Sequence, residues 1–401
     1  MNELRRHWLL EDETVFLNHG SFGACPRPVL EAQARLRERM EREPARFFTR
    51  EAPRLLAAAR EALGAFVGAD ADDLAFVPNV TTALNSVLRS FPLAPGDELL
   101  LTDHEYNATR NAALLYAQER GAQLRMARVP FPFAAGSGPE AVVAAVLEAV
   151  GPRTRLAVLD HVTSSTGLVF PIERLVAELR GRGVETLVDG AHAPGMLALD
   201  LRALGAAFYG ANCHKWLCAP KGAGFLWVRR DQRERVHPAI TSHGANAPPL
   251  PGRDRFRAEF DWMGTDDPTP ALCVPDALAF LAAVVPGGAA EVRERNRVLA
   301  LEARRIIAAA LGCALPCPDA MIGSLASLPV PSAPGLPAEA PRSALDLDPL
   351  HEALFRRGLE VPIVSCPAHP GRLLRVSAAL YNERSDYERL AAALRALGFG
   401  G

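Results

Sequence analysis

The chain has 401 residues, of which 49% are hydrophobic, so it can bury the core of a large protein with two or more structural domains. Its formal net charge is −2 and only 6% of the residues are aromatic, which argues against nucleic acid or an anionic membrane as a partner. The seven cysteines are scattered and show no CxxC or Cys/His spacing, so we expect neither a disulfide framework nor a metal site.

We expect no targeting signal in the first residues. Met1–Arg6 is polar and runs into the acidic stretch Glu11–Glu13, without the apolar core of a signal peptide. No stretch reaches the roughly 20 apolar residues of a membrane span. The sequence therefore predicts a soluble, cytoplasmic protein.

Two amphipathic helices are expected first, at Arg27–Glu43 and Pro53–Val67. A regular alternation of short apolar runs and helical patterns follows. The apolar runs are Leu74–Val77, Glu98–Leu101, Gln123–Val129, Arg155–Leu159, Glu185–Val188, Ala206–Tyr209 and Gly224–Val228. The helical patterns are Thr82–Arg89, Asn107–Arg120, Pro139–Val150 and Ile172–Arg182. This alternation predicts an α/β domain with a mainly parallel central sheet flanked by helices, and ligands bind such sheets where the strands end.

The pattern changes after residue 268, so we expect a large domain over 26–268 and a smaller C-terminal α+β domain over 269–401. A Pro-rich surface loop is expected at Pro329–Pro341. The helices expected in this part are Pro270–Val284, Ala290–Ala310, Asp348–Arg357 and Arg384–Leu397, and the strands are Ile322–Val330 and Leu373–Ser377.

Lysine is rare in this chain. Lys215 and Lys221 are its two lysines, although Lys and Arg together number 44. Unlike Arg, Lys can lose its proton, attack a carbonyl and form an imine. Lys215 lies in the run Asn212–Trp216, after an apolar stretch, which is typical of a Schiff-base lysine; chance retention of two lysines is the alternative. We assign no role to Lys221.

Asp189 ends an apolar run 26 residues before Lys215. A buried Asp needs a cationic or hydrogen-bonding partner, and a protonated pyridine nitrogen would serve, making the ring an electron sink. A helix N-cap is the alternative for Asp189. Because the run Ala206–Tyr209 lies between them, Asp189 and Lys215 are expected at neighbouring strand ends. His214, next to the lysine, can donate to a phosphate.

Three further segments follow predicted strands. Thr81 and Thr82 open a helix, where backbone N–H groups and hydroxyls can cradle a phosphate, or where Thr simply caps the helix. His104 or Tyr106 can lie flat on a pyridine ring, and Tyr106 is preferred. A polar group such as Ser164 can donate to the phenolic oxygen of the cofactor.

Together these motifs resemble the class V, fold type I enzymes that depend on pyridoxal phosphate, and within them the isopenicillin N epimerase-like group. The resemblance covers nearly the whole chain. The segments that carry it are Phe16–Gly23, Asp103–Tyr106, Asp189–His192, Asn212–Trp216, Gly264–Thr265, Leu374–Ser377 and Tyr381–Asn382.

The resemblance implies a role for each candidate residue. Lys215 would hold pyridoxal 5′-phosphate as an imine, Asp189 would pair with the ring nitrogen and His192 would lie beside the ring. Thr81, Thr82 and His214 would bind the phosphate, and Gly264 and Thr265 would reach the phosphate of the neighbouring subunit of a homodimer with shared active sites. Arg375 would bind the substrate α-carboxylate, assisted by Asn18. Residues 1–25 would pack on the active site.

The expected chemistry starts with removal of the Cα proton of an amino acid or amino-acid-containing substrate by Lys215. Return of a proton to the other face gives epimerisation, the first choice, with Tyr106 or His104 as the second acid. A Cβ–S lyase acting on a cysteine conjugate or sulfoxide is the alternative. A cysteine desulfurase would need a mobile nucleophilic cysteine, and Cys366 is better explained as buried. A non-catalytic protein of the same fold is the alternative of a different class.

Overall fold

The computed structural model describes residues 2–248, 254–331, 348–366 and 371–400. In this part of the chain the larger sheet has seven strands in the order β2-β8-β7-β6-β5-β3-β4. They are β2 (Leu74–Val77), β3 (Glu98–Thr102), β4 (Gln123–Ala127), β5 (Thr154–Asp160), β6 (Glu185–Asp189), β7 (Phe208–Asn212) and β8 (Gly224–Val228). Four pairs are parallel, and β8 runs antiparallel to β2 and β7. The predicted mainly parallel α/β sheet is therefore confirmed.

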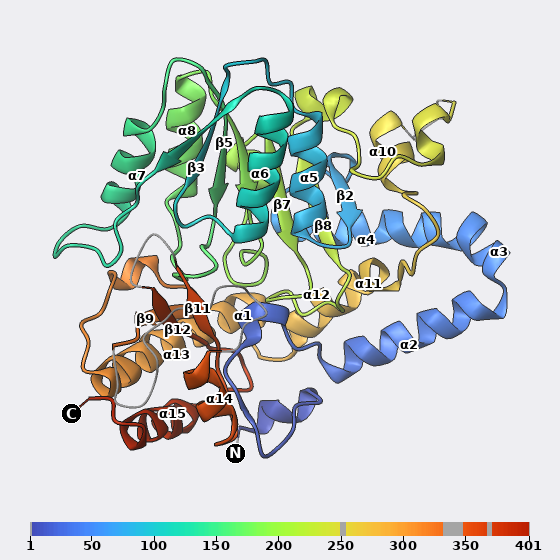
Figure 1. Cartoon of the computed structure of the whole chain (residues 1–401). Helices are drawn as coiled ribbons and strands as arrows, with labels where there is room; N and C mark the ends of the chain where they lie inside the picture. The colour runs from blue at the N-terminus through green and yellow to red at the C-terminus, as the bar shows by residue number, and fades with distance from the viewer. Residues whose placement is uncertain (1, 249–253, 332–347, 367–370, 401) are drawn as a thin grey trace.

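Helices cover both faces of this sheet (Figure 1). One face packs on α5 (Val80–Ser90), α6 (Asn107–Glu119) and α10 (Arg255–Phe260), and the other on α4 (Ala52–Val67), α7 (Pro139–Glu148) and α8 (Ile172–Gly181). Successive side chains of a strand point to opposite faces of the sheet. Leu99 and Leu101 of β3 therefore lie in the core on the side of α5, α6 and α10, whereas Leu100 lies in the core on the side of α4, α7 and α8. This is why the strands read as continuous apolar runs.

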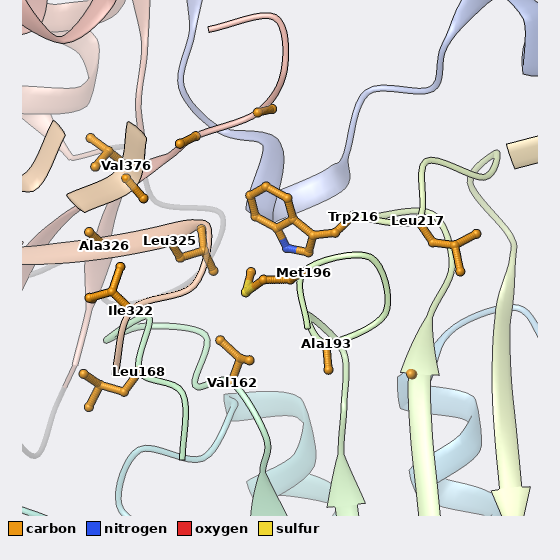
Figure 2. Packing of buried hydrophobic residues seen from close by; sticks show 14 of the residues in the cluster. Val162, Leu168, Ala193, Met196, Trp216, Leu217, Ile322, Leu325, Ala326 and Val376 are labelled. Carbon is orange, nitrogen blue, oxygen red and sulfur yellow. The ribbon is translucent and has the colours of Figure 1, made fainter. Parts of the chain in front are cut away.

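A second sheet is antiparallel and has the order β11 (Ile363–Ser365), β12 (Arg372–Ser377), β9 (Leu325–Pro329) among the described residues. The long helix α13 (Gly288–Leu311) packs against β9, β12 and α15 (Arg384–Ala396), while α14 (Pro349–Phe355) packs on β10 (Leu359–Glu360). The loops of the two sheets meet in a buried cluster in which Met196 and Trp216 lie opposite Leu325 (Figure 2).

The N-terminal segment lies against this second sheet. Its strand β1 (Val15–Phe16) pairs in parallel with β10, and α1 (His19–Phe22) follows at once. In Figure 1 this blue segment is next to the red C-terminal elements. The pairing brings residues 18–23 to the carboxyl ends of the large sheet.

Most predicted bounds agree with the structure to within a few residues, including α2 (Arg27–Arg42). The prediction of one helix at Pro270–Val284 is wrong: α11 (Thr269–Leu272) ends and α12 (Val274–Ala283) begins anew, because Pro275 has no N–H and favours the first turn of a helix. Residues 332–341 of the expected Pro-rich loop lie outside the described residues. The elements of the described residues that were not predicted are short: β1, β10, β11, α1, α3 (Pro44–Arg46), a π-helical turn (Phe47–Glu51), α9 (Leu201–Leu204), α10 and the 3-10 helices Glu3–His7, Ala71–Asp73, Arg230–Arg235, His243–Asn246 and Asp319–Met321.

Within the described residues, no single helix has both the length and the apolar character to cross a membrane. One pair, Thr269–Ala283 with Gly288–Leu311, meets the length and composition criteria together but bends by 72°. Val274, Leu281 and Ile307 of this pair are buried in the protein core.

Candidate active site

Polar side chains gather where β5, β6 and β7 end, at Asp160, Asp189 and Asn212. Asp160 and Asp189 are direct neighbours in the register of β5 and β6. The side chain of Asn212 accepts a hydrogen bond from the Val80 N–H at 2.9 Å, so β7 caps the start of α5. The candidate ligand-binding residues therefore gather at the carboxyl ends of β5, β6 and β7.

Asp189 is 2% exposed and is held in place by two donors. The Ala191 N–H donates to its Oδ1 at 3.0 Å, and the Thr109 hydroxyl donates to its Oδ2 at 3.2 Å. Burial raises the pKa of Asp189, while these donors and the charge of Lys215 lower it. A carboxyl group so placed is ready for a cationic or N–H partner.

The amine of Lys215 lies 3.2 Å from Nε2 of His192. Burial lowers the pKa of Lys215 to about 7, and the positive charge of Arg375 adds to the effect, opposed by Asp189 and Asp160. At neutral pH a substantial fraction of this lysine is therefore the free amine, which can act as a nucleophile or as a base.

The N-terminal segment packs directly on the loop that carries the lysine. His19 bonds to the Lys215 carbonyl through Nε2 at 3.1 Å, and the Lys221 amine donates to the Gly23 carbonyl at 2.7 Å. Gly23 has φ 67°, and a Cβ there would lie 2.1 Å from the His214 carbonyl oxygen. Lys221 thus joins the segment to the loop, although the sequence analysis assigned it no role.

Arg375 of β12 is 4% exposed and is held from both sides. Its NH1 donates to the carbonyl and the hydroxyl of Ser164, at 2.8 and 3.2 Å, and its NH2 donates to the Ser21 hydroxyl at 2.7 Å. Its Nε has no hydrogen-bond partner among the described residues. Burial lowers the pKa of Arg375 to about 10, so it stays cationic at neutral pH and can bind a carboxylate.

Asn18 lies close to the same region and is 6% exposed. It donates to Glu360 at 3.1 Å, and its Oδ1 is buried without a partner in the described part of the chain. A buried acceptor of this kind is ready for a donor supplied by a ligand.

The start of α5 is organised by Asn79, whose side chain accepts from the N–H of Thr82 at 3.0 Å and from its hydroxyl at 3.2 Å. Thr81, the residue before Thr82, is exposed. His214 bonds to the Ala223 carbonyl through Nδ1 at 3.1 Å, and burial lowers its pKa to about 4, so it is neutral. The helix start and His214 are thus joined through β7 and β8.

Three buried carboxyl groups, of Glu105, Asp160 and Asp189, converge so that one oxygen of each lies within 4.8 Å of the others. Both oxygens of Glu105 and Oδ2 of Asp160 have no hydrogen-bond partner among the described residues. Burial first, and then the neighbouring carboxylates, raise the pKa of Glu105 and of Asp160. Glu105 and Asp160 can therefore hold protons. Three carboxyl groups with this spacing can also hold a cation. The expectation of no metal site stays a prediction.

The two aromatic candidates differ sharply in their surroundings. Tyr106 is the N-cap residue of α6, is 43% exposed and is near enough to Arg375 to affect its pKa. His104 is 2% exposed, and its ring nitrogens bond to the Thr166 hydroxyl at 2.7 Å and to the Val129 carbonyl at 3.1 Å. Of the two, Tyr106 faces open space beside the site.

Not every predicted residue joins this group. Lys215, His192, Asp189 and Arg375 are brought together, with Ser164 bound to Arg375. Gly264 and Thr265 are exposed, and a Cβ at Gly264 would meet no atom within 4 Å. Their suggested contact with a neighbouring subunit stays a prediction.

Sequence reasoning missed the residues that act through others: Ser21, Thr109, Asn212, Trp216, Glu105 and Asp160. Ser21, Glu105, Asn212 and Trp216 lie inside motifs that had been singled out, so proximity to those motifs was the available signal. Thr109 is 80 positions from its partner Asp189, and nothing in its own helix marks it.

Comparison with known proteins identifies the family of this chain. The family model described as "Aminotransferase class-V" matches residues 24–336. The chain is 38% identical to an isopenicillin N epimerase of Streptomyces clavuligerus, covering 98% of both chains. It is 32% identical to a putative L-cysteine desulfhydrase of Oryza sativa subsp. japonica, covering 98% of this chain and 87% of the other. A solved cystine C-S lyase in complex with cysteine persulfide matches with a TM-score of 0.79 and 24% identity, covering 96% and 98% of the two chains.

The residues present fit pyridoxal 5′-phosphate, the cofactor that these similarities imply. A buried carboxylate, Asp189, suits the ring nitrogen, and a lysine with a lowered pKa suits covalent attachment. The N-terminus of α5 suits a phosphate. The chain is a pyridoxal-phosphate-dependent enzyme, and it belongs to the class V aminotransferase family.

Proposed function

We propose that this enzyme epimerises the amino-bearing carbon of an amino acid or amino-acid-containing substrate. The observation that carries the proposal is the lysine amine of Lys215, with its pKa lowered to about 7, close to the carboxylate-binding Arg375. The similarity over nearly the whole chain to an isopenicillin N epimerase supports the choice of reaction.

Each residue has a task in this proposal. When bound, the cofactor supplies an electron sink for the charge that develops at the substrate carbon. Asp189, held by Ala191 and Thr109, would pair with the ring nitrogen of the cofactor. Arg375 orients the substrate by binding its carboxylate with N–H groups, and Lys215 Nζ accepts the proton from the carbon.

Epimerisation needs a second acid that returns a proton to the opposite face. We assign this task to Tyr106, because its side chain is exposed beside Arg375, whereas His104 is enclosed and hydrogen-bonded at both ring nitrogens. Tyr106→Phe would then stop formation of the opposite stereoisomer, yet leave exchange of the Cα proton with solvent.

The runner-up is a Cβ–S lyase, supported by the relative named as a putative L-cysteine desulfhydrase. A desulfurase is less well supported, because it needs an accessible thiolate. Six of the seven cysteines are buried and Cys313 is half-buried, and burial raises the pKa of Cys25 and Cys218 to about 12. Cys366 is 2% exposed, which agrees with its reading as a buried residue.

Proton NMR in D2O with a panel of α-amino acids and cysteine conjugates tests the proposal. Deuterium at Cα together with both stereoisomers would support epimerisation. Pyruvate and ammonia from a sulfur-bearing substrate, without the opposite stereoisomer, would replace it by the lyase. We further propose a homodimer in which Gly264 and Thr265 reach the partner's phosphate site; sedimentation of Thr265→Ala and its affinity for cofactor would test this.

A further inference from the structure

Trp216, the residue that follows the lysine, contacts the ring of His192. Trp216 is 3% exposed, and its indole Nε1 lies 3.4 Å from Nδ1 of His192, which is itself 1% exposed. An indole nitrogen carries a hydrogen and has no lone pair to offer, so it can only donate. Nδ1 of His192 must therefore be the acceptor, without a proton of its own.

The charge state of His192 follows from its surroundings. Burial lowers its pKa far below the ordinary value, and the positive charges of Lys215 and Arg375, with His19 and His214 nearby, lower it further. His192 is therefore neutral and carries one proton. Because Nδ1 accepts from Trp216, that proton is on Nε2.

The Nε2–H group of His192 lies 3.2 Å from the nitrogen of Lys215. A neutral amine has a lone pair that can accept this hydrogen bond, whereas an ammonium group has none and would set two donors against each other. The other charged groups around the amine are Arg375, which opposes its protonation, and Asp189 and Asp160, which favour it.

We propose that the indole N–H of Trp216 fixes the tautomer of His192 and thereby holds the amine of Lys215 in its neutral, proton-accepting form. Trp216 is in this sense a positioning residue that acts through His192. Figure 2 shows Trp216 in the buried cluster beside Met196, so its ring is also held by packing. The inference rests on the proposed role of Lys215.

The direct test is to determine the tautomer of His192 by NMR of the holoenzyme labelled with 15N-histidine. The His192 signals are those that are lost in His192→Gln. We expect a protonated Nε2 and an unprotonated Nδ1. A protonated Nδ1 would overturn the proposal, even if every variant misfolded. Trp216→Phe should give a mixture of both tautomers, because the donor to Nδ1 is gone.

The functional test is the pH dependence of covalent cofactor attachment to the apoprotein, followed by absorbance. Trp216→Phe should raise the midpoint by about one pH unit, which makes attachment about tenfold slower on the acidic side. Trp227→Phe is the matched control, since that indole is 3% exposed and its Nε1 has no partner among the described residues. A profile for Trp216→Phe equal to that of this control would contradict the proposal.

A double variant separates this effect from simple loss of packing. If Trp216 acts through His192, then Trp216→Phe causes no further shift of the midpoint in a His192→Gln background. An equal shift in both backgrounds would make the effect structural. Covalent attachment that survives Lys215→Ala would overturn the proposed function itself, whereas the wrong tautomer would overturn only the role of Trp216.

Discussion

Asp160 and Asp189 are register partners at the carboxyl ends of the neighbouring strands β5 and β6, so two buried carboxyl groups lie side by side. Two like charges so close cannot both be ionised cheaply, and Glu105 adds a third acid. The donors from Ala191 and Thr109 reach Asp189, which favours the charged form of Asp189 over the charged forms of its neighbours.

Neutral isosteres test this division of charge. Asp160→Asn and Glu105→Gln should leave Cα proton exchange within about threefold, because burial and the neighbouring carboxylates raise the pKa of both acids and so favour their protonated forms, which the amides mimic. Asp189→Asn should slow exchange by more than about tenfold, since it removes the charge that stabilises the electron sink. Exchange is read by NMR in D2O.

Equal decreases in the rate of Cα proton exchange in all three variants would show instead that the three acids act as one charged unit. A cation in their midst is tested separately: added Mg2+ or Ca2+ should leave the thermal midpoint of the apoprotein unchanged, and a clear increase would show that the group binds metal.

Lys215→Ala should abolish covalent cofactor binding and turnover, because no other amine lies at this point of the described structure. Lys221→Met is the matched control at the other lysine. It loses the bond to Gly23 but keeps the reactive amine, so we expect weaker cofactor retention with the covalent absorbance band preserved. Full activity of Lys215→Ala would remove the basis of the assignment.

The apoprotein should become more stable as the pH rises above about 7. Burial lowers the pKa of Lys215 from 10.5 to about 7, so between these values the unfolded chain binds more protons than the folded one. The cost of burying the ammonium is complete below pH 7 and declines toward pH 10.5. Lys215→Met should therefore stabilise the apoprotein most at low pH, as measured by denaturant unfolding; a gain independent of pH would contradict this.

Arg375→Lys should raise KM for the substrate by about tenfold or more, because the planar fork that Ser164 and Ser21 orient is lost. The corresponding substrate amide, which has no carboxylate, is the control, and its KM should rise much less. If both substrates weaken equally, Arg375 supports the fold of the site and does not read the carboxylate.

Gly23→Ala should destabilise the protein and impair cofactor attachment, because the new Cβ would lie 2.1 Å from the His214 carbonyl oxygen. Gly136→Ala is a matched control: its φ is 79°, similar to the 67° of Gly23, but the added Cβ meets nothing within 4 Å. The control should cost about 1 kcal/mol from backbone strain alone. Equal losses of unfolding free energy would exclude the steric explanation.

The sequence predicts the sheet well because most strands are nearly continuous apolar runs, and it expects Asp189 and Lys215 at neighbouring strand ends, where the structure has them. It fails where a short element depends on distant partners. β1 and β10 are two residues each, and their pairing joins positions more than 340 apart. Likewise, the contact of Thr109 with Asp189 arises only when α6 packs on the sheet, so no local pattern announces it.

The bond between Ser21 and Arg375 spans 354 positions of the chain. A ribosome releases the first of these residues long before the second. The large sheet, complete at Val228, has all its strands available earlier, but the grip on the substrate carboxylate and the seat of His19 behind the lysine both await residues that emerge near the end of synthesis. A nascent chain therefore carries Lys215 before it carries a working site, and catalytic competence awaits Arg375 of the last strand and Tyr381 after it.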